Sequence, residues 1–249
     1  MQGAGLSAVL PALRLEGALK IDWMMATHFD ADHIGGLPEV LAGKDQMMGT
    51  EDDVIPSLGL LDRGDNTDKS TATYKNYVKV MAPYRTEASP GMKIDLGNGA
   101  NAKIVVVNGS FMDGRSIFLN PDEENEACIG ILIQYGAFTY FTAGDLTGGG
   151  APGGYSTKDI ETITGNLIGD IDVLHIGHHG SLTSTNQTFL DEVKPEVAVI
   201  SVGQDNDYGH PAAATLQKLT QSAVTLYRTD RDGTIVIQSD GSRYFVQTE

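Results

Sequence analysis

The chain has one cysteine, little positive charge and no long apolar run. Because the only cysteine is Cys128, an internal disulfide framework is excluded. The apolar runs fall short of the roughly 18–20 residues that span a bilayer, so we expect no membrane segment. The first residues lack a basic region followed by an apolar stretch, and no signal peptide is visible. The protein would be cytoplasmic by default, or exported if it is a fragment of a larger protein whose N-terminus lies upstream.

The scarcity of basic residues limits what the chain binds through charge. Lysine and arginine number 17 against 33 acidic residues, which gives a net charge of −16. This balance argues against broad electrostatic adhesion to nucleic acid or to an anionic membrane. A nucleic-acid substrate would have to be held mainly at bound cations or by another domain. The length of 249 residues is compatible with one α/β domain over the whole chain, with an irregular, turn-rich insertion at residues 45–95. Within this insertion, a helix or an extended segment is expected at residues 74–84.

The most informative run is residues 27–36, where four metal-competent side chains fall within six residues. These side chains are His28, Asp30, Asp32 and His33. An apolar strand is expected before them at residues 21–26 and a helix after them at residues 33–41. One aspartate at this place would serve as a helix cap, but capping explains neither histidine. Since imidazole and carboxylate groups are the usual ligands of divalent cations, the run predicts a metal site.

Three later segments place similar chemistry after apolar strands. Gly144-Asp145 follows a strand expected at residues 138–142, and His178-His179-Gly180-Ser181 follows a strand expected at residues 173–176. His210 lies in a loop after a third strand, expected at residues 197–202. In this order the four segments resemble the metallo-β-lactamase superfamily, whose first motif commonly reads His-x-His-x-Asp-His. Because Asp30 replaces the second histidine of that motif, the chain is similar to the hydrolase domain of ComEC-type competence proteins.

The resemblance implies a metallo-β-lactamase-like αββα sandwich, and the chain departs from the family at two places. The family opens with a β-hairpin and a glycine-rich strand, whereas residues 1–20 are expected to form a loop and a helix. The N-terminal strands are therefore lacking or rebuilt. The family also carries a histidine between the first motif and the strand-end aspartate. Here Asn125 stands in the matching segment, as in the ComEC-type subgroup.

The resemblance also implies a set of ligands for two divalent metal ions. His28 and Asp30 would hold the first ion, Asp32 and His33 the second, and Asp145 would bridge both. One histidine of the 178–179 pair would complete the second site. His179 is the preferred ligand and His178 the preferred proton donor or phosphate contact, although the sequence leaves open which ring points inward. Together with Asp32 and His178, His210 is a candidate catalytic residue, as a phosphate contact or else as an exposed turn histidine.

These ligands lead to a hypothesis about function. Asp30 and Asn125 make the first site rich in oxygen, which favours Mn²⁺ or Mg²⁺, while the second site keeps enough imidazole for Zn²⁺. We therefore expect two divalent ions, Zn²⁺ or Mn²⁺ or one of each, with a metal-bridging hydroxide as the nucleophile. The leading hypothesis is a phosphodiester hydrolase similar to a DNA nuclease. The alternatives are a hydrolase of small esters, lactones or phosphoesters, and a non-catalytic binding module stabilised by metal.

The remaining pattern predicts strands alternating with helices in the second half of the chain, flanked by hairpins. Further strands are expected at residues 103–107, 128–135 and 224–227, and helices at residues 159–167, 187–193 and 212–221. A hairpin turn is expected at Gly136-Ala137, and a second hairpin over residues 234–247. The glycine-rich run at residues 148–154 is expected to be a flexible link, because it lacks the Lys-Ser/Thr ending of a phosphate-binding loop.

Overall fold

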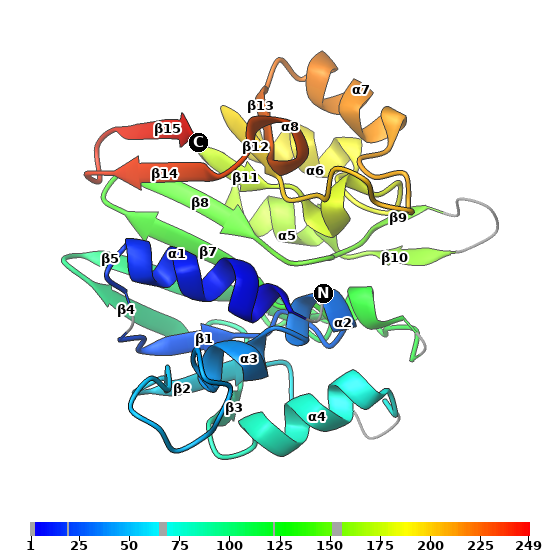
Figure 1. The fold of residues 1–249 in the computed structure, drawn as a ribbon. Helices are drawn as coiled ribbons and strands as arrows, with labels where there is room; N and C mark the ends of the chain where they lie inside the picture. The colour runs from blue at the N-terminus through cyan, green and yellow to red at the C-terminus, as the bar shows by residue number, and fades with distance from the viewer. Residues whose placement is uncertain (1–2, 19, 65–68, 122, 151–155) are drawn as a thin grey trace. The chain divides into compact units, whose positions relative to one another are not determined.

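The computed structural model describes residues 3–18, 20–64, 69–121, 123–150 and 156–249 (Figure 1). The chain divides into two compact units, unit 1 at Met1–Ala88 and unit 2 at Ser89–Glu249. Most of the glycine link expected at residues 148–154 lies outside the described residues. Over the described part of the chain, no helix is both long enough and apolar enough to cross a membrane.

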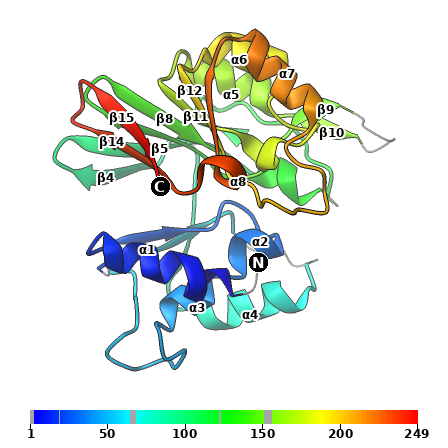
Figure 2. The same ribbon diagram turned by 45° about the horizontal axis from the view of Figure 1, so that its top comes forward.

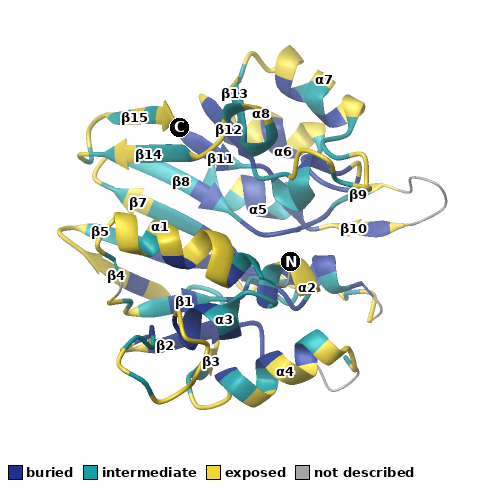
Figure 3. Cartoon of the chain, in the orientation of Figure 1, coloured by how far each residue is buried: buried dark blue, intermediate teal, exposed yellow. Residues whose placement is uncertain are grey.

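Unit 1 is built on a parallel sheet of three strands in the order β1-β2-β3. The strands are β1 (Trp23–Met25), β2 (Gly59–Asp62) and β3 (Arg85–Glu87). The helical segments are η1 (Gly5–Val9), α1 (Leu10–Leu15), α2 (Ala31–Ile34), α3 (Leu37–Leu41) and α4 (Ala72–Met81). Phe29, Leu60, Tyr77 and Met81 are fully buried in the core of this unit, whereas much of the surface of α1 is exposed (Figure 3). The expectation of a loop and a helix over residues 1–20 agrees with η1 and α1.

Residues 45–95 are more regular than the sequence indicated, because they contain β2, α4, β3 and the beginning of the next strand. The expectation of an irregular insertion is wrong at β2 and β3, whereas α4 agrees with the helix that was one of two expectations for residues 74–84. The helix α4 is amphipathic, with Tyr74, Tyr77 and Met81 on its buried side. β2 contributes Leu60 and Leu61, which are both buried. Two apolar residues between turn-forming segments are too few for a sequence pattern to indicate a strand.

The helix expected at residues 33–41 is divided into α2 and α3 at Gly35-Gly36. Pro38 lies in the first turn of α3, where the missing N–H costs nothing. A close approach of backbones explains the break, because a Cβ atom on Gly36 would lie 3.0 Å from the backbone nitrogen of Gly5. The segment η1 therefore packs directly against the break. This arrangement leaves α2 as a separate short helix that carries two of the predicted metal ligands.

Unit 2 contains an eight-stranded sheet in the order β13-β12-β11-β8-β7-β5-β4, with β6 paired to β5. Its strands in chain order are β4 (Lys93–Gly97), β5 (Ala100–Val107), β6 (Ser110–Phe111), β7 (Gly130–Tyr135), β8 (Phe138–Thr142), β11 (Val173–His175), β12 (Val197–Ile200) and β13 (Thr225–Arg228). The strands from β8 to β13 run parallel, whereas β8, β7, β5 and β4 pair antiparallel. The tight hairpin expected at Gly136-Ala137 connects β7 and β8 and is confirmed.

The two faces of the parallel strands are covered differently. Helices cover one face, and a hairpin covers the other (Figure 2). The helices are α5 (Glu161–Ile168), α6 (Gln187–Val193) and α7 (Ala213–Gln221), and the hairpin strands are β14 (Ile235–Ser239) and β15 (Tyr244–Thr248). Along β12, Ala198 and Ile200 pack in the helix-side core, whereas Val197 and Val199 pack against the hairpin. This two-residue alternation is the expected consequence of strand geometry.

Several smaller elements of unit 2 were not expected. β9 (Gly148–Gly150) pairs antiparallel with β10 (Thr157–Asp159), so the first residues of the expected flexible link form a strand. Two 3₁₀ segments, η2 (Glu124–Ala127) and η4 (Gly177–Gly180), and the short helix α8 (Thr229–Asp232) complete the unit. The strand at residues 138–142 and the helix at residues 187–193 have the predicted bounds. The predicted mixed α/β fold class is confirmed by these elements.

Candidate metal centre

The predicted site residues of unit 2 lie at one edge of its sheet. Asp145 follows β8, His178 and His179 follow β11, and His210 lies in the loop after β12. These three strands are parallel neighbours in the order β8-β11-β12. Because the carboxyl ends of parallel strands meet at the same sheet edge, residues that are far apart in the sequence come together there. The topology of this unit thus brings the predicted residues into one cluster.

The two adjacent histidines adopt an uncommon backbone conformation. His178 has φ 50° and ψ 42°, and His179 has φ 52° and ψ 24°, so both lie in the left-handed region. This region costs a residue with a side chain roughly 1–2 kcal/mol. The backbone N–H of His178 donates to the carbonyl of Gly144 at 3.1 Å, which holds the turn against the end of β8. Strain of this kind concentrates at functional sites, where the surrounding structure enforces it.

Gly180 is the last residue of this turn and allows the loop at Pro211 and Ala212 to approach it closely. Its φ is 79°, and a Cβ atom on it would lie 2.6 Å from the Cβ atom of Pro211. The N–H of Ala212 also donates to the carbonyl of Gly180 at 2.9 Å. A side chain at this position would therefore push apart the turn that carries His179 and the loop that carries His210. Glycine is required here for steric reasons.

The carboxylate of Asp145 faces both histidines. Its Oδ2 atom lies 3.8 Å from Nε2 of His178, and its Oδ1 atom lies 3.9 Å from Nε2 of His179. The two oxygens thus face different imidazoles. Two ligands with bonds of about 2.1 Å to one tetrahedral ion lie roughly 3.4 Å apart. The observed spacings are close to this value, so the residues present fit divalent metal ions.

The hydrogen bonds of the two imidazoles differ in a way that affects their chemistry. Nδ1 of His179 lies 2.7 Å from the carbonyl oxygen of Ser201, and a carbonyl only accepts. His179 therefore donates from Nδ1, which leaves the lone pair of Nε2 for a metal. Nδ1 of His178 lies 3.0 Å from the hydroxyl of Thr183, a group that either donates or accepts. The tautomer of His178 is therefore not fixed by this partner.

Two further polar groups surround His178. The ring of His210 meets the ring of His178 edge-on, with centroids 5.6 Å apart and an interplanar angle of 70°. Burial lowers the pKa of His210, and repulsion by the two neighbouring histidines lowers it further, so the ring is neutral near pH 7. Asn125 lies on η2 with its amide nitrogen 3.4 Å from Nε2 of His178. Among the described residues, its buried Oδ1 atom has no hydrogen-bond partner, which leaves an oxygen ligand available.

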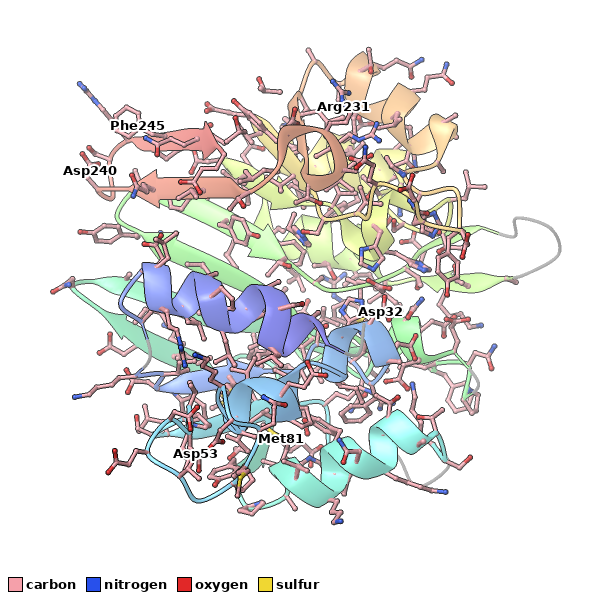
Figure 4. The ribbon with its side chains drawn as sticks, in the orientation of Figure 1. Asp32, Asp53, Met81, Arg231, Asp240 and Phe245 are labelled. Carbon is pink, nitrogen blue, oxygen red and sulfur yellow. The ribbon has the colours of Figure 1, made fainter. Side chains whose placement is uncertain are left out.

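The predicted ligands of unit 1 form a second cluster around the beginning of α2. The rings of His28 and His33 have centroids 4.0 Å apart. Nε2 of His28 lies 3.8 Å from Oδ2 of Asp30, and Nε2 of His33 lies 3.7 Å from Oδ2 of Asp32, the residue of α2 that is labelled in Figure 4. Asp30 occupies the N-cap position, but its side chain makes no capping hydrogen bond. The capping alternative therefore does not explain this aspartate.

The sequence did not indicate the partner of Asp30. The ammonium group of Lys69 donates to Oδ1 of Asp30 at 2.7 Å. The Lys69 side chain is 13% exposed, whereas the Asp30 side chain is 42% exposed. A lysine in a turn-rich stretch belongs to no motif, so only the folded chain shows this pair. Its positive charge compensates the carboxylate that was assigned to the first ion.

A buried network of side chains in unit 1 packs around Phe29, which lies between the predicted ligands His28 and Asp30. Phe29, between two predicted ligands, packs under the guanidinium of Arg63, which lies 4.6 Å from its ring centroid. The fully buried carboxylate of Asp62 accepts from the hydroxyl of Tyr77 at 2.7 Å and from the guanidinium of Arg85. Arg85 also lies over the ring of Phe29 at 5.8 Å. These cation–π contacts hold the Phe29 ring in the core of unit 1, next in sequence to the predicted ligand His28.

The comparisons with known proteins agree with the motifs. No protein-family model matches the chain. It is 27% identical over 233 residues, 93% of its length, to ComE operon protein 3 of Bacillus subtilis. It is also 27% identical to the competence protein ComA of Neisseria gonorrhoeae over 93% of its length, and 26% identical to recombination protein 2 of Haemophilus influenzae over 96%. The chain spans about a quarter of the length of these relatives.

A solved structure supports the fold. The diiron β-hydroxylase CmlA of Streptomyces venezuelae matches 84% of this chain and 44% of its own chain, with a TM-score of 0.50 and 15% identity. A likeness at this identity concerns the fold alone. The predicted fold class and the resemblance in sequence are both confirmed. The chain has the α/β fold of the metallo-β-lactamase superfamily and is similar over nearly its whole length to ComEC-type competence proteins.

Proposed function

We propose that this chain is a metal-dependent hydrolase of phosphodiester bonds and that its two units act as one domain. The observation that supports the proposal most is the geometry of Asp145, whose two carboxylate oxygens face the Nε2 atoms of two different histidines at 3.8 and 3.9 Å. A structural ion pair needs no second imidazole and no strained backbone. A carboxylate that bridges two metal ions directs its two oxygens to different positions, and here one oxygen faces the proposed ligand His179 while the other faces the proposed proton donor His178.

The proposed ligand set follows the order of the motifs along the chain. His28 and Asp30 would hold the first ion, and Asp32 and His33 would hold the second. From unit 2, Asp145 would bridge the ions and His179 would complete the second site. The hydrogen bond from His179 to the Ser201 carbonyl supports its role as a ligand, because it directs the lone pair of Nε2 away from the protein backbone. When bound, divalent ions would supply Lewis-acid activation of water and of the phosphoryl group.

The remaining polar groups would act on the substrate. The tautomer of His178 is not fixed by Thr183, so this ring suits a proton donor toward the leaving oxygen. The neutral ring of His210 would donate a hydrogen bond to the phosphate. Asp32, as a ligand with a second carboxylate oxygen, would help to orient the attacking water. The Asn125 amide would contribute an oxygen ligand or a phosphate contact.

Two considerations favour a phosphodiester over a small carboxylic ester. Oxygen-rich sites bind Mn²⁺ and Mg²⁺, and these ions commonly handle phosphate groups. The relatives in sequence are described as competence and recombination proteins, which supports DNA as the substrate. The net charge of −16 opposes binding of a polyanion to the general surface. DNA would therefore depend on the metal ions, and on other parts of a longer protein, for its affinity.

The test is a turnover assay on metal-free protein reloaded with Mn²⁺ or with Zn²⁺. The substrates are a single-stranded oligonucleotide and a small chromogenic phosphodiester, with metal-free protein as the control. We expect metal-dependent cleavage of both substrates. Cleavage of the small ester with the oligonucleotide intact would favour the alternative of a small-molecule hydrolase. Fewer than about one ion per chain, together with no turnover, would instead favour a non-catalytic module.

A further inference from the structure

An exposed aromatic ring extends the histidine cluster of unit 2 toward solvent. Tyr208 is 84% exposed. Its ring lies nearly parallel to that of His210, at an interplanar angle of 16° with centroids 5.9 Å apart. His210 in turn meets His178 edge-on at 5.6 Å. The three rings therefore form a continuous series from the candidate site to the surface, and the outermost ring presents its face to solvent.

The exposure of Tyr208 does not result from an unconstrained loop. Asn206 clamps the turn, because its amide nitrogen donates to the carbonyls of Gly203 at 3.0 Å and of His210 at 2.7 Å. Its Oδ1 atom accepts from the backbone N–H of His210 at 2.9 Å. Both backbone groups of His210 are thus held by one side chain. The loop therefore holds a large aromatic ring in water at a fixed place, where the face that does not contact His210 is available to a planar partner.

The charges of this loop restrict the chemistry of that partner. The neighbours Asp205 and Asp207 are exposed, and residues 203–211 contain no lysine or arginine. Such a loop supplies no cation to a phosphate group, so its phosphate contacts are limited to neutral donors such as the ring of His210. An uncharged planar group suits both the ring face and the acidic surroundings. In a nucleic acid the uncharged planar group is the base, and stacking on an aromatic side chain strengthens binding of one unpaired base by roughly 5- to 150-fold.

We propose that Tyr208 is a specificity-determining residue that stacks on an unpaired nucleobase next to the phosphodiester bond that is cleaved. The inference rests on the proposed function and narrows its substrate to single-stranded nucleic acid. Bases inside a duplex already stack on their neighbours, so their faces are not accessible to the tyrosine. Binding by stacking also explains how an acidic protein recognises part of a polyanion without a basic surface.

The experiment compares a single-stranded oligonucleotide with the same oligonucleotide carrying abasic sites around the cleaved bond. We expect Tyr208→Ala to raise KM for the normal oligonucleotide about ten-fold, which is about 1.4 kcal/mol, with little change in kcat. On the abasic oligonucleotide the variant and the unmodified protein should have the same KM. Tyr208→Phe keeps the ring and should behave like the unmodified protein.

Phe245→Ala is the matched control. Phe245, labelled in Figure 4, is 62% exposed and lies on β15 of the hairpin in the same unit. The turn of that hairpin contacts Gly136 and Ala137 at the beginning of β8, whereas Asp145 follows the other end of the strand. This variant should leave both KM values unchanged. A Tyr208→Ala protein with an unchanged KM, or with an equal change on both oligonucleotides, would overturn the inference.

A binding measurement separates failure of this inference from failure of the proposed function. Fluorescence anisotropy of both oligonucleotides with protein loaded with Ca²⁺, an ion that oxygen ligands also bind, requires no turnover. If the unmodified protein cleaves no DNA yet binds the normal oligonucleotide more tightly than the abasic one, and Tyr208→Ala removes the difference, the stacking role stands and the nuclease activity does not. If binding shows no dependence on the bases, the stacking role is refuted whatever the protein cleaves.

Discussion

A buried carboxylate next to the histidine turn makes the stability of the protein depend on pH. Glu161 is 3% exposed and accepts from the backbone N–H groups of Thr185 at 2.6 Å and of Asn186 at 2.8 Å. Burial raises its pKa from 4.5 to about 7, because the loss of hydration outweighs these hydrogen bonds and the attraction of Lys218. The carboxyl group therefore prefers to be neutral in the folded protein.

The sign and size of the effect follow from this pKa. In the unfolded chain Glu161 loses its proton near pH 4.5, whereas in the folded protein it does so near pH 7. Between these values the folded state holds one proton more, so the free energy of unfolding falls as the pH rises. The whole difference corresponds to about 3 kcal/mol. Ionisation of Glu161 lowers the free energy of unfolding by this full amount above pH 7 and has no effect on it below pH 4.5.

Urea unfolding of the unmodified protein and of Glu161→Gln between pH 4.5 and 7.5 tests this expectation. The variant cannot ionise, so its stability relative to the unmodified protein should rise by about 3 kcal/mol across this range. The glutamine amide leaves one backbone N–H without an acceptor, which adds a constant cost that does not depend on pH. Glu192→Gln, on the exposed side of α6, is the control. Parallel stability curves for the Glu161 variant and the unmodified protein would refute the reasoning.

Two substitutions test the first metal site. Lys69→Met removes the ammonium group that competes with a metal ion for the negative charge of Asp30. Because that charged hydrogen bond is partly exposed, we expect Mn²⁺ affinity to rise about ten-fold in an electron paramagnetic resonance titration. The control Lys75→Met, on the exposed side of α4, should bind Mn²⁺ with the affinity of the unmodified protein. Equal Mn²⁺ affinity in the Lys69 and Lys75 variants would count against competition at Asp30. Asp30→His should raise the affinity for Zn²⁺ relative to Mn²⁺ in competitive dialysis, and an unchanged ratio would remove Asp30 from the ligand set.

The sequence predicted the parts of the fold that depend on local pattern and strand direction. Apolar strands were expected before Gly144-Asp145 and before His178-His179, and in unit 2 the parallel pairing of these strands brings the residues to one edge. The ligand roles of these residues stay predictions. The division between α2 and α3 was missed, since it depends on the close approach of Gly5 to Gly36, which are far apart along the chain.

The hydrogen bonds and the ion pair that support the candidate site could not be predicted either, because they join residues that are far apart along the chain. A backbone carbonyl such as that of Ser201 carries no sequence information, yet it fixes the tautomer of His179. Lys69 reaches Asp30 across 39 residues, and Glu161 reaches Thr185 across 24. Such pairs depend on how segments meet in the fold, whereas motif spacing reports only the ends of individual strands.

The metal content of Asp145→Ala tests the central claim most directly. After loading with Mn²⁺ and removal of free metal, inductively coupled plasma mass spectrometry gives the number of ions per chain. We expect two ions for the unmodified protein and for the control Asp170→Ala, whose carboxylate is exposed in a turn. Asp145→Ala should hold fewer than one ion and lose metal-dependent turnover, while its circular dichroism spectrum stays unchanged. An Asp145→Ala protein that retains both ions and near-normal turnover would contradict the assignment of Asp145 as the bridging ligand.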